Sequence, residues 1–128
     1  MPFYSWYFLV PPRAERAYEV WVEGEALETV EIRFPPGPCG LLKVAVFYGV
    51  KQIVPLEEGT FVAGDDEAVR AEPHWPLPES PCRLIIYARN EDEVYPHEFH
   101  LRLQTKAKEE RVYARLTEEG FLEVVLPA

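Results

Sequence analysis

Three neighbouring carboxylates follow a glycine near the middle of the chain, in the run G-D-D-E at residues 64–67. Carboxylates bind divalent cations and act as acids or bases, so this run is the first candidate for chemistry. A calcium loop, however, places its acidic ligands at alternating positions, and neighbouring side chains of an extended backbone point to opposite sides. Aspartate also favours turn conformations. We therefore predict a hairpin turn between residues 61–62 and 68–71, with a weak surface cation site as the alternative.

Two histidines lie three residues apart in the segment P-H-E-F-H, at His97 and His100. On a helix this spacing would bring both imidazoles to one face, where they could share a metal ion, but on a strand they face opposite sides. Residues 98–105 alternate between apolar and polar side chains, which predicts a strand. We therefore expect solvent-facing histidines and no metal site.

Motifs for covalent catalysis and phosphate binding are missing from the sequence, which has no nucleophile elbow and no phosphate-binding glycine loop. We predict a protein that is not an enzyme, with no catalytic residue, no metal and no cofactor. A small hydrolase with paired carboxylates stays open as an alternative, because such partners meet only in the folded chain.

Aromatic side chains are stronger candidates, and they indicate binding. Residues 3–10 form a predicted strand with aromatic residues on both faces, as expected for a strand that is fully buried or covered by another chain. Trp75 lies in the proline-rich stretch at residues 72–81, where it is either exposed for stacking or folded back as a lid over the end of the domain. The interface residues that we predict are Tyr4, Trp6, Phe8, His74, Trp75 and Leu77.

The elements that must position these residues are short segments with period-two alternation, which is typical of half-buried strands. Proline-rich runs such as F-P-P-G-P-C-G separate them, because proline cannot donate to a strand ladder. Nine or ten such strands predict an all-β fold, an antiparallel β-sandwich or jelly roll, in a single domain over residues 1–128. Residues 106–119 fit a helix only loosely, so we favour a strand there, and we predict a closing hairpin that turns near Glu119 and Gly120.

The bulk composition limits the classes of partner. The 128 residues carry a formal net charge of -9, which disfavours nucleic acid and anionic membranes. The beginning of the chain has no signal-peptide pattern, and its apolar run is too short to span a bilayer, so we expect synthesis in the cytoplasm. Cys39 and Cys82 either form one disulfide or are two buried thiols. Few amide side chains together with 13 prolines are typical of thermophilic proteins.

Residues 34–69 contain three segments with a recurring order: F-P-P-G-P-C-G-L, Y-G-V-K-Q-I-V-P and G-T-F-V-A-G-D-D-E. They resemble small β-rich proteins encoded in the genomes of tailed bacteriophages, and the later segment I-I-Y-A-R-N-E-D-E-V-Y-P-H-E-F-H-L-R-L has a similar layout. The resemblance covers residues 34–103. It implies a virion-associated β-sandwich and brings no catalytic residues with it.

From these observations we expect a non-enzymatic structural protein that assembles with other copies of itself and with other virion proteins of a thermophilic phage, in capsid decoration or in the tail. The expected location is thus the virion. The alternative is a carbohydrate-binding module in which Trp75, with Trp21 or Trp6, stacks on a glycan.

Overall fold

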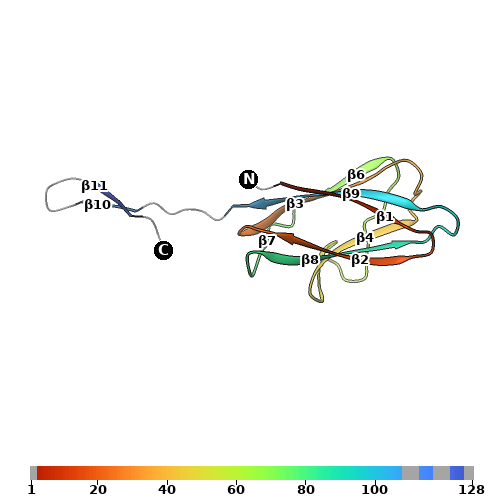
Figure 1. Ribbon diagram of the computed structural model, residues 1–128, viewed down its shortest axis with the longest axis horizontal. Coiled ribbons are helices and arrows are strands. Elements are labelled where there is room, and N and C mark those ends of the chain that lie inside the picture. Colours follow the sequence, from red (N-terminus) through yellow and green to blue (C-terminus); the bar gives the residue numbers. More distant parts are fainter. Residues whose placement is uncertain (1–2, 108–112, 117–121, 126–128) are drawn as a thin grey trace.

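The computed structural model describes residues 3–107, 113–116 and 122–125. Two antiparallel sheets pack face to face (Figure 1). Sheet A has five strands in the order β1-β9-β3-β6, with β7 also paired to β3, and sheet B has four strands in the order β2-β8-β4-β5. The predicted antiparallel β-sandwich of about nine or ten short strands is confirmed. Its strands are β1 (Phe3–Val10), β2 (Glu15–Val22), β3 (Ala26–Phe34), β4 (Leu42–Tyr48), β5 (Lys51–Val54), β6 (Glu67–Ala71), β7 (Trp75–Pro76), β8 (Cys82–Asn90) and β9 (His97–Lys106).

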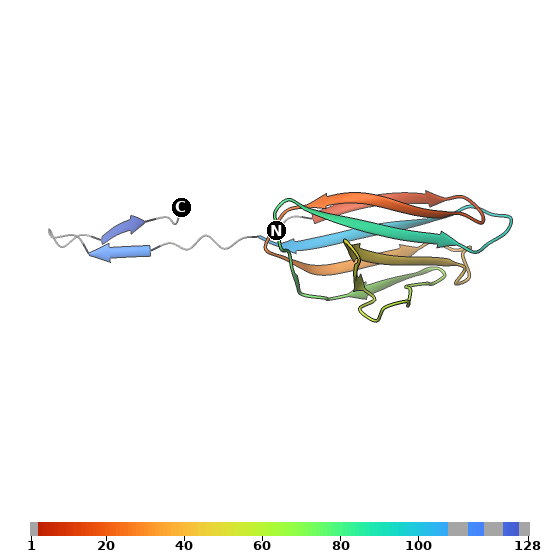
Figure 2. The same ribbon diagram turned by 90° about the horizontal axis from the view of Figure 1, so that it is seen from below.

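The strand pairs are nested along the chain. β4 pairs with β5, β3 with β6, β2 with β8 and β1 with β9, and every pair is antiparallel. The first four strands alternate between the sheets, so each turn of the chain crosses from one layer to the other (Figure 2). As a result, the first strand of the sandwich lies beside its last strand.

Period-two alternation explains why these segments become strands with one buried face. In β9 the residues that face the core are fully buried, and those between them face solvent at least in part. This is the pattern of an antiparallel sheet with one covered side, and it confirms the strand predicted for residues 98–105. The inward residues are Phe99, Leu101 and Leu103, and the outward residues are His100, Arg102 and Gln104.

The core lies between the two sheets and draws on nearly every strand of the sandwich. Phe34 of β3 and Phe99 of β9 are its largest fully buried side chains. In β4 even Ala45, on the outer side of the sheet, is inaccessible to solvent. β4 and β8 are the two inner strands of sheet B, a position that suits their nearly continuous apolar sequences.

The acidic run at residues 64–67 is not a hairpin turn. Val62 forms an antiparallel bridge with Val44 of sheet B, whereas β6 pairs with β3 in sheet A. Residues 63–66 therefore carry the chain from one sheet to the other. The prediction was wrong because the segments on either side of the run find their partners in different sheets, not in each other.

A separate hairpin follows the sandwich. β10 (Tyr113–Leu116) and β11 (Leu122–Val125) pair with each other and with no other described strand. Figures 1 and 2 both show this hairpin apart from the two sheets. The predicted closing hairpin and the strand within residues 106–119 are confirmed by β10 and β11, while the turn predicted near Glu119 and Gly120 lies outside the described residues.

Candidate interaction surfaces

β1 presents different surfaces to the core and to solvent. Its inner side chains, Tyr4, Trp6 and Phe8, are half-buried and pack against the core. Its outer side chains are mostly accessible to solvent, although most of them are large and apolar. These exposed residues are Phe3, Tyr7 and Leu9, with 68%, 72% and 62% of their surface accessible.

His100 of the neighbouring β9 holds the middle of this outer surface in place. The Tyr7 ring stacks on the His100 ring, with centroids 4.1 Å apart and planes within 11° of parallel. Ser5 forms a hydrogen bond through its hydroxyl to Nε2 of the same imidazole. Burial, and then the nearby Arg102 guanidinium, lower the pKa of His100 below its ordinary value. The neutral imidazole is therefore the form that supports the β1 surface.

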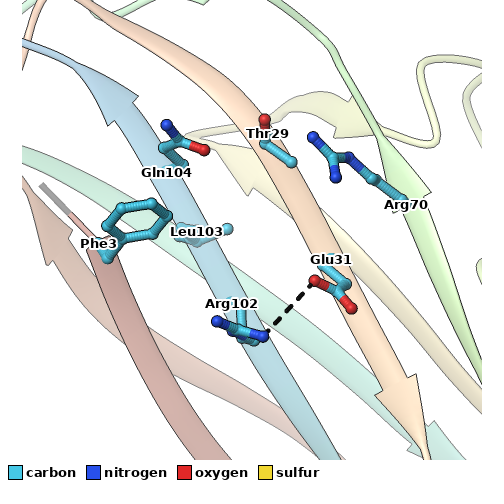
Figure 3. Close-up of a pocket in the computed structure, with 7 residues that line it drawn as sticks. All are labelled: Phe3, Thr29, Glu31, Arg70, Arg102, Leu103 and Gln104. Atoms are coloured by element: carbon cyan, nitrogen blue, oxygen red, sulfur yellow. Dashed lines mark ion pairs between the residues drawn. The ribbon is translucent and has the colours of Figure 1, made fainter. Parts of the chain in front are cut away.

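A shallow polar hollow of about 230 Å³ lies beside β1 on the outer face of sheet A (Figure 3). Arg102 and Glu31 form an ion pair across it at 4.0 Å. Arg70 also lines it and pairs with Glu72 at 3.2 Å. The ring of Phe3 borders the hollow. Because its charged groups are already paired, the hollow extends the β1 surface with polar groups.

The proline-rich segment packs against the sandwich. Trp75 is half-buried, its ring lies 5.3 Å from that of Tyr48, and its backbone pairs with Leu27 in β3. Leu77 also packs on the core, and its amide donates to the Glu25 carbonyl at 2.8 Å. Of the two alternatives for Trp75, the structure thus has the lid.

His74, the exposed member of this predicted group, is held by an acidic side chain. Its Nδ1 lies 2.6 Å from a carboxylate oxygen of Glu28. The interface role predicted for His74, Trp75 and Leu77, and for the inner residues of β1, stays a prediction, since no partner chain is present to test it.

Trp21 is the most exposed tryptophan of the sandwich and lies on the outer face of sheet B. About half of its surface, 51%, is accessible. Its indole N–H donates to Oε1 of Glu19 at 2.7 Å, and Oε2 of the same carboxylate pairs with Arg83 at 3.0 Å. The ring is thus held in one orientation beside a carboxylate and a guanidinium, an arrangement in which an aromatic face and polar groups are available together.

Asp65 ties the acidic run to the proline-rich turn between β3 and β4. Its Oδ1 accepts hydrogen bonds from the backbone amides of Gly37 (2.8 Å) and Cys39 (3.1 Å). These two bonds lower the pKa of the Asp65 carboxyl below its ordinary value. Asp66 points to Arg33 instead, at 3.9 Å. The adjacent carboxylates thus have separate structural partners.

The histidines of β9 face opposite sides, as predicted, but His97 is not solvent-facing. It is buried, and its Nε2 lies 2.8 Å from Asp92 in the turn before β9. Both cysteines are free thiols, with Cys82 buried and Cys39 exposed, so neither predicted alternative holds in full. Among the described residues, no group of three His, Cys, Asp or Glu side chains is placed to hold a metal ion.

One hollow contains two carboxylates. It has a volume of about 240 Å³ and lies at the end of the sandwich, between the β2–β3 turn and the segment that leads into β8. Glu25 and Glu79 both line it, but Glu79 accepts a hydrogen bond from the Tyr48 hydroxyl at 3.4 Å. One of the two carboxylates in this hollow thus has a hydroxyl partner.

The apolar surface that sequence reasoning missed is the outer side of β1. The sequence prediction chose the other side of the strand because that side has the larger aromatic rings, including the indole of Trp6. It therefore did not include Phe3, Tyr7 and Leu9. Alternation alone does not say which face of a doubly apolar strand is buried. A usable signal was the pair of prolines that ends the strand at the chain's first reversal, a position typical of an edge strand.

No family model and no curated protein matches this chain. In the part of the chain that the structure describes, no helix has the length and apolarity needed to cross a membrane.

Proposed function

We propose that this chain is a non-enzymatic structural protein that assembles with copies of itself. The observation that carries this proposal is the apolar outer side of β1, where Phe3, Tyr7 and Leu9 are each more than three-fifths exposed. Contiguous exposed apolar side chains on a soluble domain mark surfaces that a partner covers. His100 fixes the ring of Tyr7 in advance, so little side-chain freedom is lost on docking.

Within this class, the proposed role is a virion component of a thermophilic phage. The resemblance over residues 34–103 supports this role. The nested strand pairs support a jelly roll, a form of the double-sheet sandwich that viral capsid domains use. Likeness of fold is an analogy and does not by itself assign a function. Capsid decoration and tail are both compatible with such a module.

Sedimentation velocity of the wild-type protein over a range of micromolar concentrations tests the proposal. We expect a species larger than the 14.8 kDa monomer whose share grows with concentration. A protein that sediments as a monomer throughout this range would contradict it. Tail or capsid genes beside the gene for this chain would support the virion role independently.

Carbohydrate binding is the second candidate, and Trp21 is the observation that favours it. Its exposed ring is held by Glu19, with Arg83 alongside, so a sugar could stack on the indole while its hydroxyls bond to the charged groups. A glycan array with the wild type and with Trp21→Ala tests this candidate. Trp75→Ala serves as the control, because that ring packs against Tyr48. The candidate is ruled out if the wild type binds no sugar.

A further inference from the structure

The two sheets of the sandwich have four edges, and three of these edges carry features that discourage pairing with another chain. Charged side chains, prolines and short length protect the edges of natural sheets. β2 carries Glu15, Arg16 and Glu19, and the four-residue β5 begins with Lys51. The remaining edge of sheet A is formed by β6, which has five residues including two charged ones, and by the two-residue β7 with its proline.

β1 has none of these protections. It is eight residues long, reads F-Y-S-W-Y-F-L-V, and contains neither a charged residue nor a proline. Among the described strands, β9 alone pairs with it, so its other edge is open. A long, apolar and unprotected edge strand is a template for pairing with a further strand.

The charge of the protein indicates which strand that is. Each chain carries a formal net charge of -9, so two copies repel each other on average, and a joint between them is least opposed where the facing strands carry no charge. β1 is such a neutral strand, and two copies of it meet without placing like charges opposite each other. We infer that β1 of one chain pairs antiparallel with β1 of a second copy, so that two A sheets join into one continuous sheet. This inference rests on the proposed self-assembly.

The register of this pair follows from the geometry of sheets. Side chains directly opposite each other lie on the same face. The two-fold axis must therefore place one residue of β1 directly opposite the same residue of the partner's β1, and it cannot fall between two successive residues. The carbonyls of Leu9 and Val10 already accept hydrogen bonds from Tyr18 (3.2 Å) and the Asn90 amide (3.1 Å), but each keeps a second lone pair, so these bonds do not decide the register. An axis at Trp6 pairs residues 3–9 and gives each exposed apolar side chain of β1 a partner within the strand. An axis at Tyr7 would place Phe3 opposite the partner's Pro11, outside the strand, so the geometry favours Trp6.

With the axis at Trp6, the exposed outer side chains cover one another. Phe3 faces the partner's Leu9, and Ser5 faces the partner's Tyr7. The isologous arrangement repeats each contact twice, as a two-fold interface requires. The apolar surface that each chain exposes alone thus becomes a continuous row across the joint.

Two single substitutions and their mixture test both the strand and the register. Phe3→Glu and Leu9→Lys each replace one member of the facing apolar pair, at positions that are 68% and 62% exposed, so both variants should fold. Each alone should weaken association at least about tenfold, because both copies of the pair are lost. In an equimolar mixture the two variants should form heterodimers, in which one joint holds Glu opposite Lys and the other keeps Phe opposite Leu.

Val50→Lys is the matched control, because that side chain is 99% exposed in the β4–β5 turn and far from the proposed axis in sequence and sheet. It should leave association unchanged. Circular dichroism of all variants checks the fold, and sedimentation velocity measures association. Hydrogen exchange should also show protection of the β1 amides that rises with wild-type concentration.

The outcomes separate this inference from the proposed function. If the wild type associates but neither single variant weakens it, the interface lies elsewhere and the β1 pairing is overturned while self-assembly stands. If both singles weaken association but the mixture restores nothing, another strand such as the β10–β11 hairpin of a second copy covers β1, and the two-fold pairing is overturned. A monomeric wild type overturns both.

Discussion

Asn90 is the only asparagine of the chain, and it joins three segments at one end of the sandwich. Its side-chain amide donates to the carbonyls of Val10 (3.1 Å) and Tyr95 (3.0 Å), and its Oδ1 accepts from the Asp92 amide (2.9 Å). Only 1% of the residue is exposed. In a composition otherwise poor in amides, the one asparagine has a buried position at which both donor and acceptor are used.

Replacing Asn90 with aspartate keeps the shape of the side chain and removes the donor. We expect Asn90→Asp to lower the free energy of unfolding by about 3 kcal/mol or more at pH 7, since a buried carboxylate would then face two carbonyl oxygens. Acidification should reduce the difference in free energy of unfolding between Asn90→Asp and the wild type, because the protonated carboxyl of the new aspartate can again donate a hydrogen bond. Urea denaturation measures the effect.

Glu91→Gln is the matched control for this change, because it exchanges acid and amide at the exposed neighbouring residue. It should change stability by less than about 0.5 kcal/mol. An Asn90→Asp protein with wild-type stability would show that the three hydrogen bonds do not hold this end of the sandwich together.

Asp65 should make the fold sensitive to acid. Amide hydrogen bonds from Gly37 and Cys39 lower the pKa of its carboxyl in the folded chain. The unfolded chain therefore takes up the proton first, so the stabilisation is present above the ordinary aspartate pKa and is lost as the pH falls through the lower folded value. Thermal melts across this acidic range should show Asp65→Asn less stable than wild type at neutral pH, and the gap should close in acid.

The adjacent carboxylate supplies the comparison for Asp65. Asp66 reaches only Arg33, at 3.9 Å on the surface, and exposed ion pairs contribute little. Asp66→Asn should therefore leave the acid profile close to that of wild type. Equal behaviour of the two variants would mean that the amide bonds to Asp65 do not influence stability.

At the scale of the strand, alternation in the sequence indicated where several of the long strands lie. β9 is a clear case, since its inward residues Phe99, Leu101 and Leu103 alternate with polar residues that face outward. The pairing of strands could not be predicted in the same way, because β1 and β9 are separated by most of the chain and no local pattern links them. The acidic run at residues 64–67 is an example. Its residue types predicted a change of chain direction, but they did not show that the segments on either side belong to different sheets.

The candidate surface was predicted only in part for a similar reason. The sequence identified β1 as an unusual strand, but apolar residues on both sides gave no basis for choosing the exposed one. The contact between Ser5, Tyr7 and His100 joins residues on strands remote in sequence, so it became visible only in the fold.

The turn between β2 and β3 depends on a glycine. Gly24 has a φ of +142°, and a Cβ added there would lie 2.7 Å from the Lys106 carbonyl oxygen at the end of β9. Gly24→Ala should therefore cost at least about 2 kcal/mol of unfolding free energy, from backbone strain and from displacement of β9. Chemical denaturation provides the measurement.

Gly37→Ala separates these two causes. Gly37 has a φ of +128°, close to that of Gly24, but a Cβ there would lie 3.7 Å from the His97 ring, an ordinary contact distance. It should cost less than Gly24→Ala, about 1 kcal/mol, because only the backbone strain remains. If the two variants lost equal stability, the close approach to β9 would not matter.

For the whole molecule, net charge predicts how salt acts on association. Two chains of formal charge -9 repel each other, while the proposed joint between β1 strands contains no ion pair to be screened. Added salt should therefore strengthen association, because it screens the repulsion. Sedimentation at low and high sodium chloride checks this. Weaker association in high salt would indicate an interface built on opposite charges and would count against β1.

The nested order of the strands also has a consequence for synthesis. A ribosome completes β1 at residue 10 but does not reach β9 until residues 97–106, so the aromatic strand has no partner of its own during most of translation. Chains that are translated side by side on one messenger RNA expose the same unpaired apolar strand, β1, to one another until β9 is made. Folding that depends on pairing between such distant segments is also slow. β1, the strand proposed to join folded molecules, is therefore also the segment through which nascent chains are most exposed to premature association.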